Sequence, residues 1–183
     1  MNKKTLQRTV FAGLCAAIIF IGISLFRINL PAVVGRPFIH FGNTFAVVTV
    51  LVLGFRYGAA AAMIGLGLFD VLNGYAATAW ITVLEALVLS AVVAQTFHWL
   101  HYHPGQLAKL YLVSLAAGLI KIVTSWVAGV IESLMVGTQL PVACVNSFLS
   151  LPATVINSAA TFLLVPLIYL ALEKTILKRI HLR

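Results

Sequence analysis

The chain has 183 residues, of which 62% are hydrophobic and only 9% are charged, and its net charge is +8. A mean hydropathy of +1.07 excludes an ordinary soluble protein, and no stretch is long and polar enough to form a second, soluble domain. A membrane-spanning helix needs about 20 apolar residues, so this length allows about six spans with short loops. We therefore predict an all-α integral membrane protein with a single transmembrane domain over residues 1–183.

Turn-forming residues divide the apolar sequence into six predicted helices. Pro31 ends the first, Gly54 opens a tight turn after the second, and Asn73 begins an Asn-Gly turn after the third. The predicted spans are residues 8–30, 41–54, 57–73, 79–98, 107–131 and 147–172. The second and third spans are short, so we expect one or both to tilt, break or lie partly sheltered from lipid.

The basic residues predict the orientation, because Lys and Arg concentrate in cytoplasmic loops. With the N-terminus in the cytoplasm, nine of the twelve Lys and Arg residues lie on the cytoplasmic side. Arg27 and Arg36 lie outside, and Lys121 lies within the membrane. An odd number of spans would leave one basic terminus outside, so both termini are predicted to be cytoplasmic. The positive charge therefore indicates membrane orientation and not nucleic-acid binding.

Two charged residues, Glu85 and Lys121, interrupt otherwise apolar spans. A charge at membrane depth costs about 2.5–3.5 kcal/mol even on mild insertion scales, so such residues usually face a cavity, a partner or a ligand. With a rise of about 1.5 Å per residue, both residues fall at nearly the same depth, in the outer half of the bilayer. They are therefore expected to pair with each other, to contact a ligand, or to do both.

Polar residues also form a stripe on each of the last three spans. Residues spaced three, four and seven apart share one helix face. The stripes are Thr78, Thr82 and Glu85; Lys121, Ser125, Ala128 and Glu132; and Asn146, Ser150, Thr154, Asn157 and Thr161. Three neighbouring helices with polar stripes predict a shared binding cavity near the extracellular face.

The first outer loop and the outer ends of the helices provide further candidate residues for this cavity. Residues 35–45 form an apolar loop with His40 and Asn43, which is typical of a lid over an outward-facing site. Asn73 ends the third span on the same side. Tyr75 and Trp80 belong either to the aromatic belt of the membrane interface or to the wall of a small-molecule pocket.

Several kinds of site are missing from the sequence. It has no Walker A loop, no H-E-x-x-H zinc motif and no G-x-S-x-G nucleophile elbow. The loop residues His98, His101 and His103 have no nearby Cys or acid to complete a metal site, and Cys15 and Cys144 are interpreted as small apolar residues. We therefore predict no enzymatic activity, no metal and no cofactor.

Two segments carry a family resemblance, PFIHFGNTF at residues 37–45 and GLGLFDVLNGY at residues 65–75. Together with the length and the six spans, they resemble the substrate-binding S components of energy-coupling factor (ECF) vitamin importers, in the riboflavin/pyridoxine-type branch. The resemblance implies a multi-pass protein of a bacterial plasma membrane. Its partners would be a membrane coupling protein and two ATP-binding subunits, which hydrolyse ATP.

The resemblance also implies where the ligand and the partner bind. A pyridoxine- or hydroxymethylpyrimidine-like vitamin is favoured, with riboflavin or pantothenate as alternatives. The candidate ligand-binding residues are His40, Asn43, Asn73, Tyr75, Trp80, Glu85, Lys121, Ser125, Asn146 and Asn157. The candidate partner-binding residues on the first span are Ala12, Gly13, Ala16 and Ala17, whose spacing also suits internal helix packing.

Two other classes of function fit the same residues. Glu85 and Lys121 are the kind of intramembrane pair that relays protons, so a proton-coupled carrier that works alone is one alternative. The small-residue faces also suit a structural or assembly subunit that binds other helices and no ligand.

Overall fold

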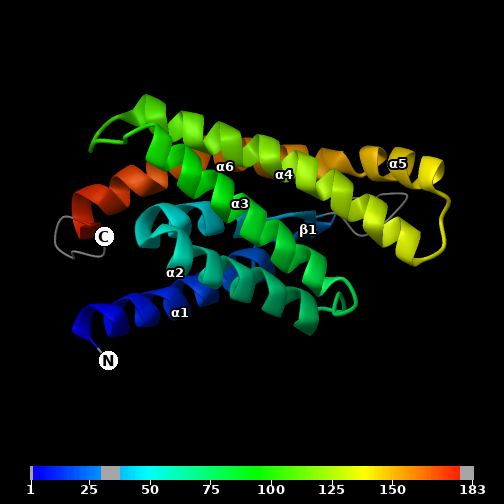
Figure 1. Cartoon of the computed structure of the whole chain (residues 1–183), viewed down its shortest axis with the longest axis horizontal. Helices are drawn as coiled ribbons and strands as arrows, with labels where there is room; N and C mark the ends of the chain where they lie inside the picture. Colours follow the sequence, from blue (N-terminus) through cyan, green and yellow to red (C-terminus); the bar gives the residue numbers. More distant parts are fainter. Residues whose placement is uncertain (1, 30–37, 178–183) are drawn as a thin grey trace.

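The computed structural model describes residues 2–29 and 38–177 and is almost entirely helical (Figure 1). Its helices are α1 (Lys3–Ser24), α2 (Gly42–Leu72), α3 (Ala79–Trp99), α4 (Leu107–Met135), α5 (Leu140–Leu149), α6 (Leu151–Leu172) and the π-helical turn η1 (Glu173–Leu177). Two short strands, β1 (Ile28–Asn29) and β2 (Phe38–Ile39), pair antiparallel. Pro31, Arg36 and the first part of the predicted lid lie outside the described residues.

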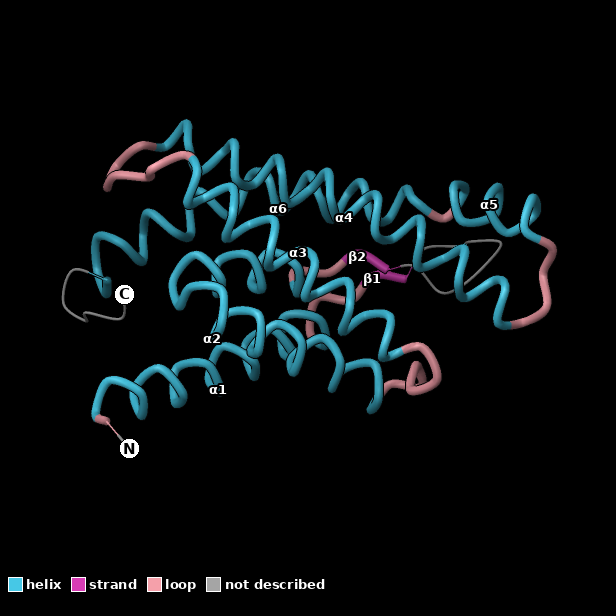
Figure 2. The backbone as a smooth tube through the Cα atoms, in the orientation of Figure 1, coloured by secondary structure: helices cyan, strands magenta, loops and turns pink. Residues whose placement is uncertain are grey.

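Helix α2 is two helical limbs joined by a reversal at Gly54. This glycine has φ 77° and ψ 175°, a conformation that is nearly confined to glycine. A Cβ atom at Gly58 would lie 2.5 Å from the Cα atom of Val50, although eight residues of a straight helix span about 12 Å. The limbs, residues 42–53 and 55–72, therefore run side by side in opposite directions (Figure 2).

The reversal gives six helical rods, which confirms the predicted helix count. In the described part of the chain, five helices are long and apolar enough to cross a membrane, and α2 is one of them. The start of α1 and the end of α6 lie at one end of the bundle, and the α2–α3 and α4–α5 connections lie at the other (Figure 1). Both termini are thus expected on one side of the membrane, as predicted.

The first limb of α2 is the centre of the bundle. All of its residues except Phe45 and Val52 are buried, so it is sheltered from lipid as the short second span predicted. On one side it packs in a core with α3, α4 and α6, centred on Val93, Val113 and Tyr169. A second core joins α1, both limbs of α2 and α3. A hydrogen bond between side chains also joins this limb to α6, since the hydroxyl oxygens of Thr44 and Thr161 lie 3.0 Å apart.

The predicted boundaries of two spans are wrong, for local reasons. The first span was expected at 8–30, but α1 starts at Lys3, where the Asn2 side chain caps it, and ends at Ser24 because Ile28 and Asn29 pair as β1. The last span was expected at 147–172, but α6 starts at Leu151 and the separate helix α5 precedes it. Each of these two helices has a proline in its first turn, where proline is well tolerated.

Candidate functional site

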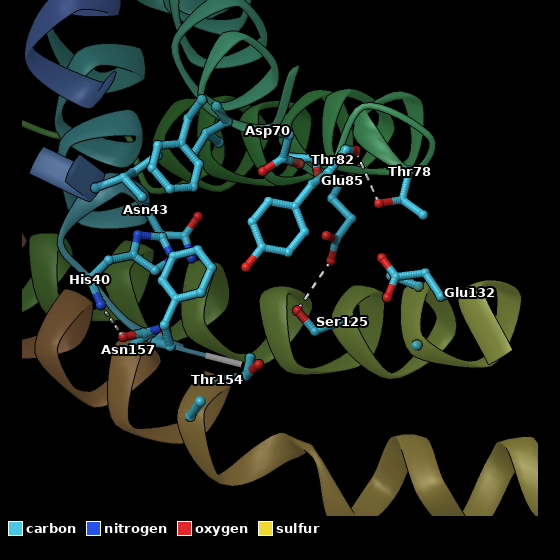
Figure 3. A pocket seen from close by; sticks show the side chains of 18 of the residues that line it. His40, Asn43, Asp70, Thr78, Thr82, Glu85, Ser125, Glu132, Thr154 and Asn157 are labelled. Atoms are coloured by element: carbon cyan, nitrogen blue, oxygen red, sulfur yellow. Dashed lines mark hydrogen bonds between the residues drawn. The ribbon is translucent and has the colours of Figure 1, made fainter. Parts of the chain in front are cut away.

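A cavity of about 840 Å³ opens between both limbs of α2, α3, α4, α6 and the loops at residues 38–40 and 73–78. This volume lies within the range of about 300–1,000 Å³ that is typical of small-molecule sites. The α2–α3 loop and the end of α4 contribute to its wall, so it lies toward the end of the bundle away from the termini. Figure 3 shows polar side chains of α2, α3, α4 and α6 pointing toward it.

An ion pair forms one side of this cavity. The Lys121 Nζ atom lies 2.8 Å from Glu85 Oε1, and the two side chains are 16% and 14% exposed. The Ser125 hydroxyl donates a hydrogen bond of 3.2 Å to the same carboxylate oxygen. The expectation that the two charges lie at one depth is confirmed, and they pair with each other while facing the cavity. Buried pairs are seldom more stable than apolar packing, so the cost of this one suggests a function.

Two further acids line the cavity. Asp70 projects from the second limb of α2 and Glu132 from the outer half of α4 (Figure 3). Three of the four acidic residues of the chain therefore face one cavity, with Lys121 as the one Lys or Arg among the described lining residues.

Aromatic rings form another part of the cavity wall. The Phe38 ring lies 5.7 Å from Phe69, 6.3 Å from Tyr75 and 5.0 Å from His40, measured between centroids. The Arg27 guanidinium covers Phe38 at 5.0 Å, in the geometry of a cation–π contact. The buried Tyr75 hydroxyl has no hydrogen-bond partner in the described structure. A buried tyrosine hydroxyl normally has one, so a ligand is a natural candidate.

The Asn157 side chain fixes the loop that carries this wall. Its Oδ1 accepts a hydrogen bond of 3.0 Å from the His40 backbone N–H, and its Nδ2 donates one of 3.0 Å to the Phe38 carbonyl. The His40 ring in turn accepts a hydrogen bond at Nδ1 from the Gly42 N–H. Burial first, and the Lys121 charge second, lower the pKa of His40 to about 3, so this ring is neutral at ordinary pH.

The structure brings eight of the ten candidate ligand-binding residues to the cavity. They are His40, Asn43, Asn73, Tyr75, Glu85, Lys121, Ser125 and Asn157. Trp80 lies elsewhere and is 49% exposed, because it faces away from the Thr78–Thr82–Glu85 stripe of α3. Asn146 is half-buried outside the cavity, because the break at Ser150 interrupts the stripe that was expected to run along one helix.

Other lining residues were visible in the sequence but were not assigned to the site. Thr78, Thr82, Glu132 and Thr154 lie on the predicted stripes and line the cavity. Their helical spacing was a sufficient signal. Phe38 and Phe69 gave no such signal, since an aromatic residue in an apolar segment usually packs in a core or at the interface.

The predicted partner face on α1 is divided between the interior and the surface. Ala16 is buried, and a Cβ atom at Gly65 would lie 2.7 Å from the Ala16 carbonyl oxygen, so this side packs on α2. Gly13 and Ala17 are exposed, and Ala12 is half-buried. The accessible part of the motif is therefore Gly13 and Ala17.

The comparisons with known proteins agree with this architecture. Residues 3–174 match the family described as ECF-type riboflavin transporter, S component. A search of curated proteins found no match. A solved structure of ThiT from Listeria monocytogenes has a TM-score of 0.66 and 20% sequence identity, and the alignment covers 96% of this chain and 98% of that one. That likeness shows the fold. Since the family match takes in nearly the whole sequence, this chain belongs to the S components of ECF-type riboflavin transporters.

Proposed function

We propose that this protein is the vitamin-binding subunit of an ECF-type importer and that its ligand is a small heteroaromatic vitamin, of pyridoxine or hydroxymethylpyrimidine type. Family membership supports a transport subunit for a vitamin and not an enzyme. The observation that carries the proposal is the cavity itself, which has an aromatic wall on one side and charged groups on the other. Small-molecule sites are commonly built from apolar walls and a few placed polar groups.

The wall and the polar groups match different parts of such a ligand. A flat heteroaromatic ring would pack against Phe38 and Tyr75, where offset stacking adds to the burial of apolar surface. Substituents on the ring would then reach the Tyr75 hydroxyl, the Ser125 hydroxyl and the Glu85–Lys121 pair. The paired charges would orient the ligand by hydrogen bonds without either charge being left uncompensated.

Riboflavin is the second candidate, because the matching family is described by that vitamin and a volume of about 840 Å³ suits a larger ligand as well. Direct competition separates the two. If riboflavin displaces a bound pyridoxine-type probe and binds with the higher affinity of the two, riboflavin is the substrate.

The proposed partners are a membrane coupling protein and two ATP-binding subunits in the plasma membrane of a bacterium. The exposed residues Gly13 and Ala17 of α1 support a contact with the coupling protein, because small residues let helices approach closely in lipid. Vesicles that contain only this chain should show no uptake. Uptake by this chain alone, lost when the proton gradient collapses, would instead indicate a proton-coupled carrier.

Equilibrium binding to the purified protein tests the site. We expect Lys121→Ala and Glu85→Ala each to weaken vitamin binding at least about tenfold, because each leaves the other charge of a buried pair uncompensated. The double variant Lys121→Met/Glu85→Gln removes both charges, so neither charge is left unpaired to destabilise the fold. A loss of vitamin binding in this variant therefore reflects the site and not unfolding.

Lys109→Ala is the matched control, since Lys109 contacts the His101 carbonyl in the loop far from the cavity. It should bind as the wild type does. Unchanged affinity in both Lys121→Ala and Glu85→Ala would remove this cavity as the vitamin site.

A further inference from the structure

The cavity holds more negative than positive formal charge. Asp70, Glu85 and Glu132 come from three different helices, and Lys121 is the one Lys or Arg that accompanies them in the described lining. The whole chain carries 12 basic and four acidic side chains. Acids are thus scarce in this protein, yet three of the four meet at one small cavity.

The positive charge of Lys121 is already committed. Its Nζ atom lies 2.8 Å from Glu85, which leaves the carboxyl groups of Asp70 and Glu132 without a cationic partner among the described residues. Asp70 and Glu132 are therefore available to pair with a positive charge on a ligand.

Two other basic residues contact the aromatic wall, and each is engaged elsewhere or carries no charge. The Arg27 guanidinium lies over the Phe38 ring, and its Nε donates a hydrogen bond of 2.9 Å to Asn29. His40 is a neutral ring whose Nδ1 accepts a hydrogen bond from the Gly42 N–H. Neither group neutralises Asp70 or Glu132 in this structure.

A cationic ligand would interact favourably with both the acidic and the aromatic parts of the cavity wall. Carboxylates in a site with apolar walls attract a cation strongly and repel an anion, because the surroundings screen them less than water does. The aromatic face of Tyr75 adds a further attraction for a positive charge. The unpartnered Tyr75 hydroxyl offers the same ligand a hydrogen bond.

We infer that this cavity selects a ligand with a positive charge, carried by a protonated amine or a cationic ring nitrogen, and rejects carboxylates and phosphate esters. The inference rests on the proposed function, since it concerns the same cavity. It narrows the substrate class by charge, which the family description does not do. It also makes pantothenate, with its carboxylate, the least suitable of the vitamins considered.

Three probes that share one pyridine frame test the charge directly. Pyridoxamine carries an aminomethyl group, pyridoxine a hydroxymethyl group and 4-pyridoxate a carboxylate at the same ring position. Calorimetric titration of the purified protein at pH 7 should show affinity falling in that order, at least about tenfold from the first to the last. Equal affinities would show that the acids bind as protonated, neutral donors, and that result, or a preference for 4-pyridoxate, would overturn the inference.

The carboxyl groups themselves are tested with neutral variants. Asp70→Asn and Glu132→Gln should each reduce the affinity ratio of pyridoxamine to 4-pyridoxate several-fold. Glu173→Gln is the matched control, because Glu173 is the fourth acid and binds Tyr102 outside the cavity. It should leave the ratio unchanged. A ratio that survives both cavity variants would contradict the role of these acids.

The charge preference and the proposed vitamin class can fail separately. If no pyridine probe binds, the pyridoxine class is wrong, and the charge is tested with riboflavin against its phosphate ester and with panthenol against pantothenate. The anion of each pair should bind more weakly. If none of these binds either, mass spectrometry of the small molecule that copurifies decides, and an anion there would overturn the inference.

Discussion

At the scale of single residues, Asn157 and His40 show how the cavity wall is held. Asn157 uses both ends of its amide on the backbone of residues 38–40, so its role in this structure is to position the loop. Because His40 accepts a hydrogen bond at Nδ1, its neutral ring carries the proton on Nε2. The ring is thereby fixed as a neutral group beside the cavity.

The lowered pKa of His40 predicts a specific dependence of stability on pH. The folded pKa of about 3 lies below the ordinary value of 6.5, so the native state resists protonation. This contribution to stability is fully present above pH 6.5 and is lost as the pH falls toward 3, by up to about 1.4 kcal/mol per pH unit. Urea unfolding in detergent at pH 7 and pH 5 should therefore show a smaller loss of stability in His40→Gln than in the wild type.

The control for this prediction is His103→Gln, because His103 is an exposed loop histidine. It should keep the pH dependence of the wild type. The same loss of stability between pH 7 and pH 5 in His40→Gln and in the wild type would contradict the assignment.

The Glu85–Lys121 pair and Tyr75 could be predicted from the sequence as parts of the site, whereas Phe38 and Phe69 could not. Glu85 and Lys121 stand out because a charge in a membrane span is costly, and their depths follow from the helical rise. Their 2.8 Å contact agrees with that simple estimate. Phe38 and Tyr75 meet through the fold of a loop and a strand pair, which has no periodicity to detect.

At the scale of secondary structure, the reversal at Gly54 decides the architecture. The turn and the two helices on either side of it were visible in the sequence, and the structure shows that Gly54 alone has a non-helical backbone between them. The helix α5 was not predicted, because the last span was expected to run unbroken over residues 147–172, whereas Pro141 and Pro152 each lie in the first turn of a separate helix. A proline can either end a helix or lie in the first turn of one, and only the packing of the following residues distinguishes the two cases.

The conformation of Gly54 gives a prediction at this scale. Gly54→Ala should destabilise the protein by about 1–3 kcal/mol, because φ 77° with ψ 175° is strained for any residue with a Cβ atom. A lower thermal unfolding midpoint of the detergent-solubilised protein would measure it. A Cβ atom at Gly54 meets no other atom within 4 Å, so the loss reflects the backbone alone.

Gly13→Ala is the matched control for this substitution. Gly13 lies within α1, and a Cβ atom there also meets nothing within 4 Å. Alanine favours a helix over glycine by up to about 1 kcal/mol, so this variant should be at least as stable as the wild type. If Gly54→Ala behaves like Gly13→Ala, the reversal at Gly54 is contradicted.

At the scale of the whole molecule, the two ends of the bundle differ. The cavity lies toward one end, while near the other end the rings of Phe97, Tyr102 and Tyr169 pack against one another. There the Tyr102 hydroxyl donates to Glu173 at 3.0 Å, and burial first, with Glu173 second, raises the pKa of Tyr102 to about 12. A ligand could leave the cavity on that side only if these packed rings moved apart, and we propose that the partner subunits drive such a movement.

Helix α1 is the element best placed to contact the proposed partner subunits. It packs mainly on α2, and its outer face carries exposed apolar residues such as Val10 and Leu14 beside Gly13 and Ala17. Since α1 does not share the charged side of the cavity, its outer face can be changed without altering the ligand site. Binding and coupling are thus expected to be separable by mutation.

We therefore predict that Gly13→Leu and Ala17→Leu abolish vitamin uptake and keep the affinity of the wild type for the vitamin. Bulky side chains at these positions prevent close approach of a partner helix. Uptake by vesicles that contain the complete importer, together with binding to the isolated subunit, measures the two effects. Ala91→Leu is the matched control, because Ala91 is an exposed alanine on α3, and it should change neither. Normal uptake in both α1 variants would place the partner contact elsewhere, whereas weakened binding would show that α1 supports the cavity.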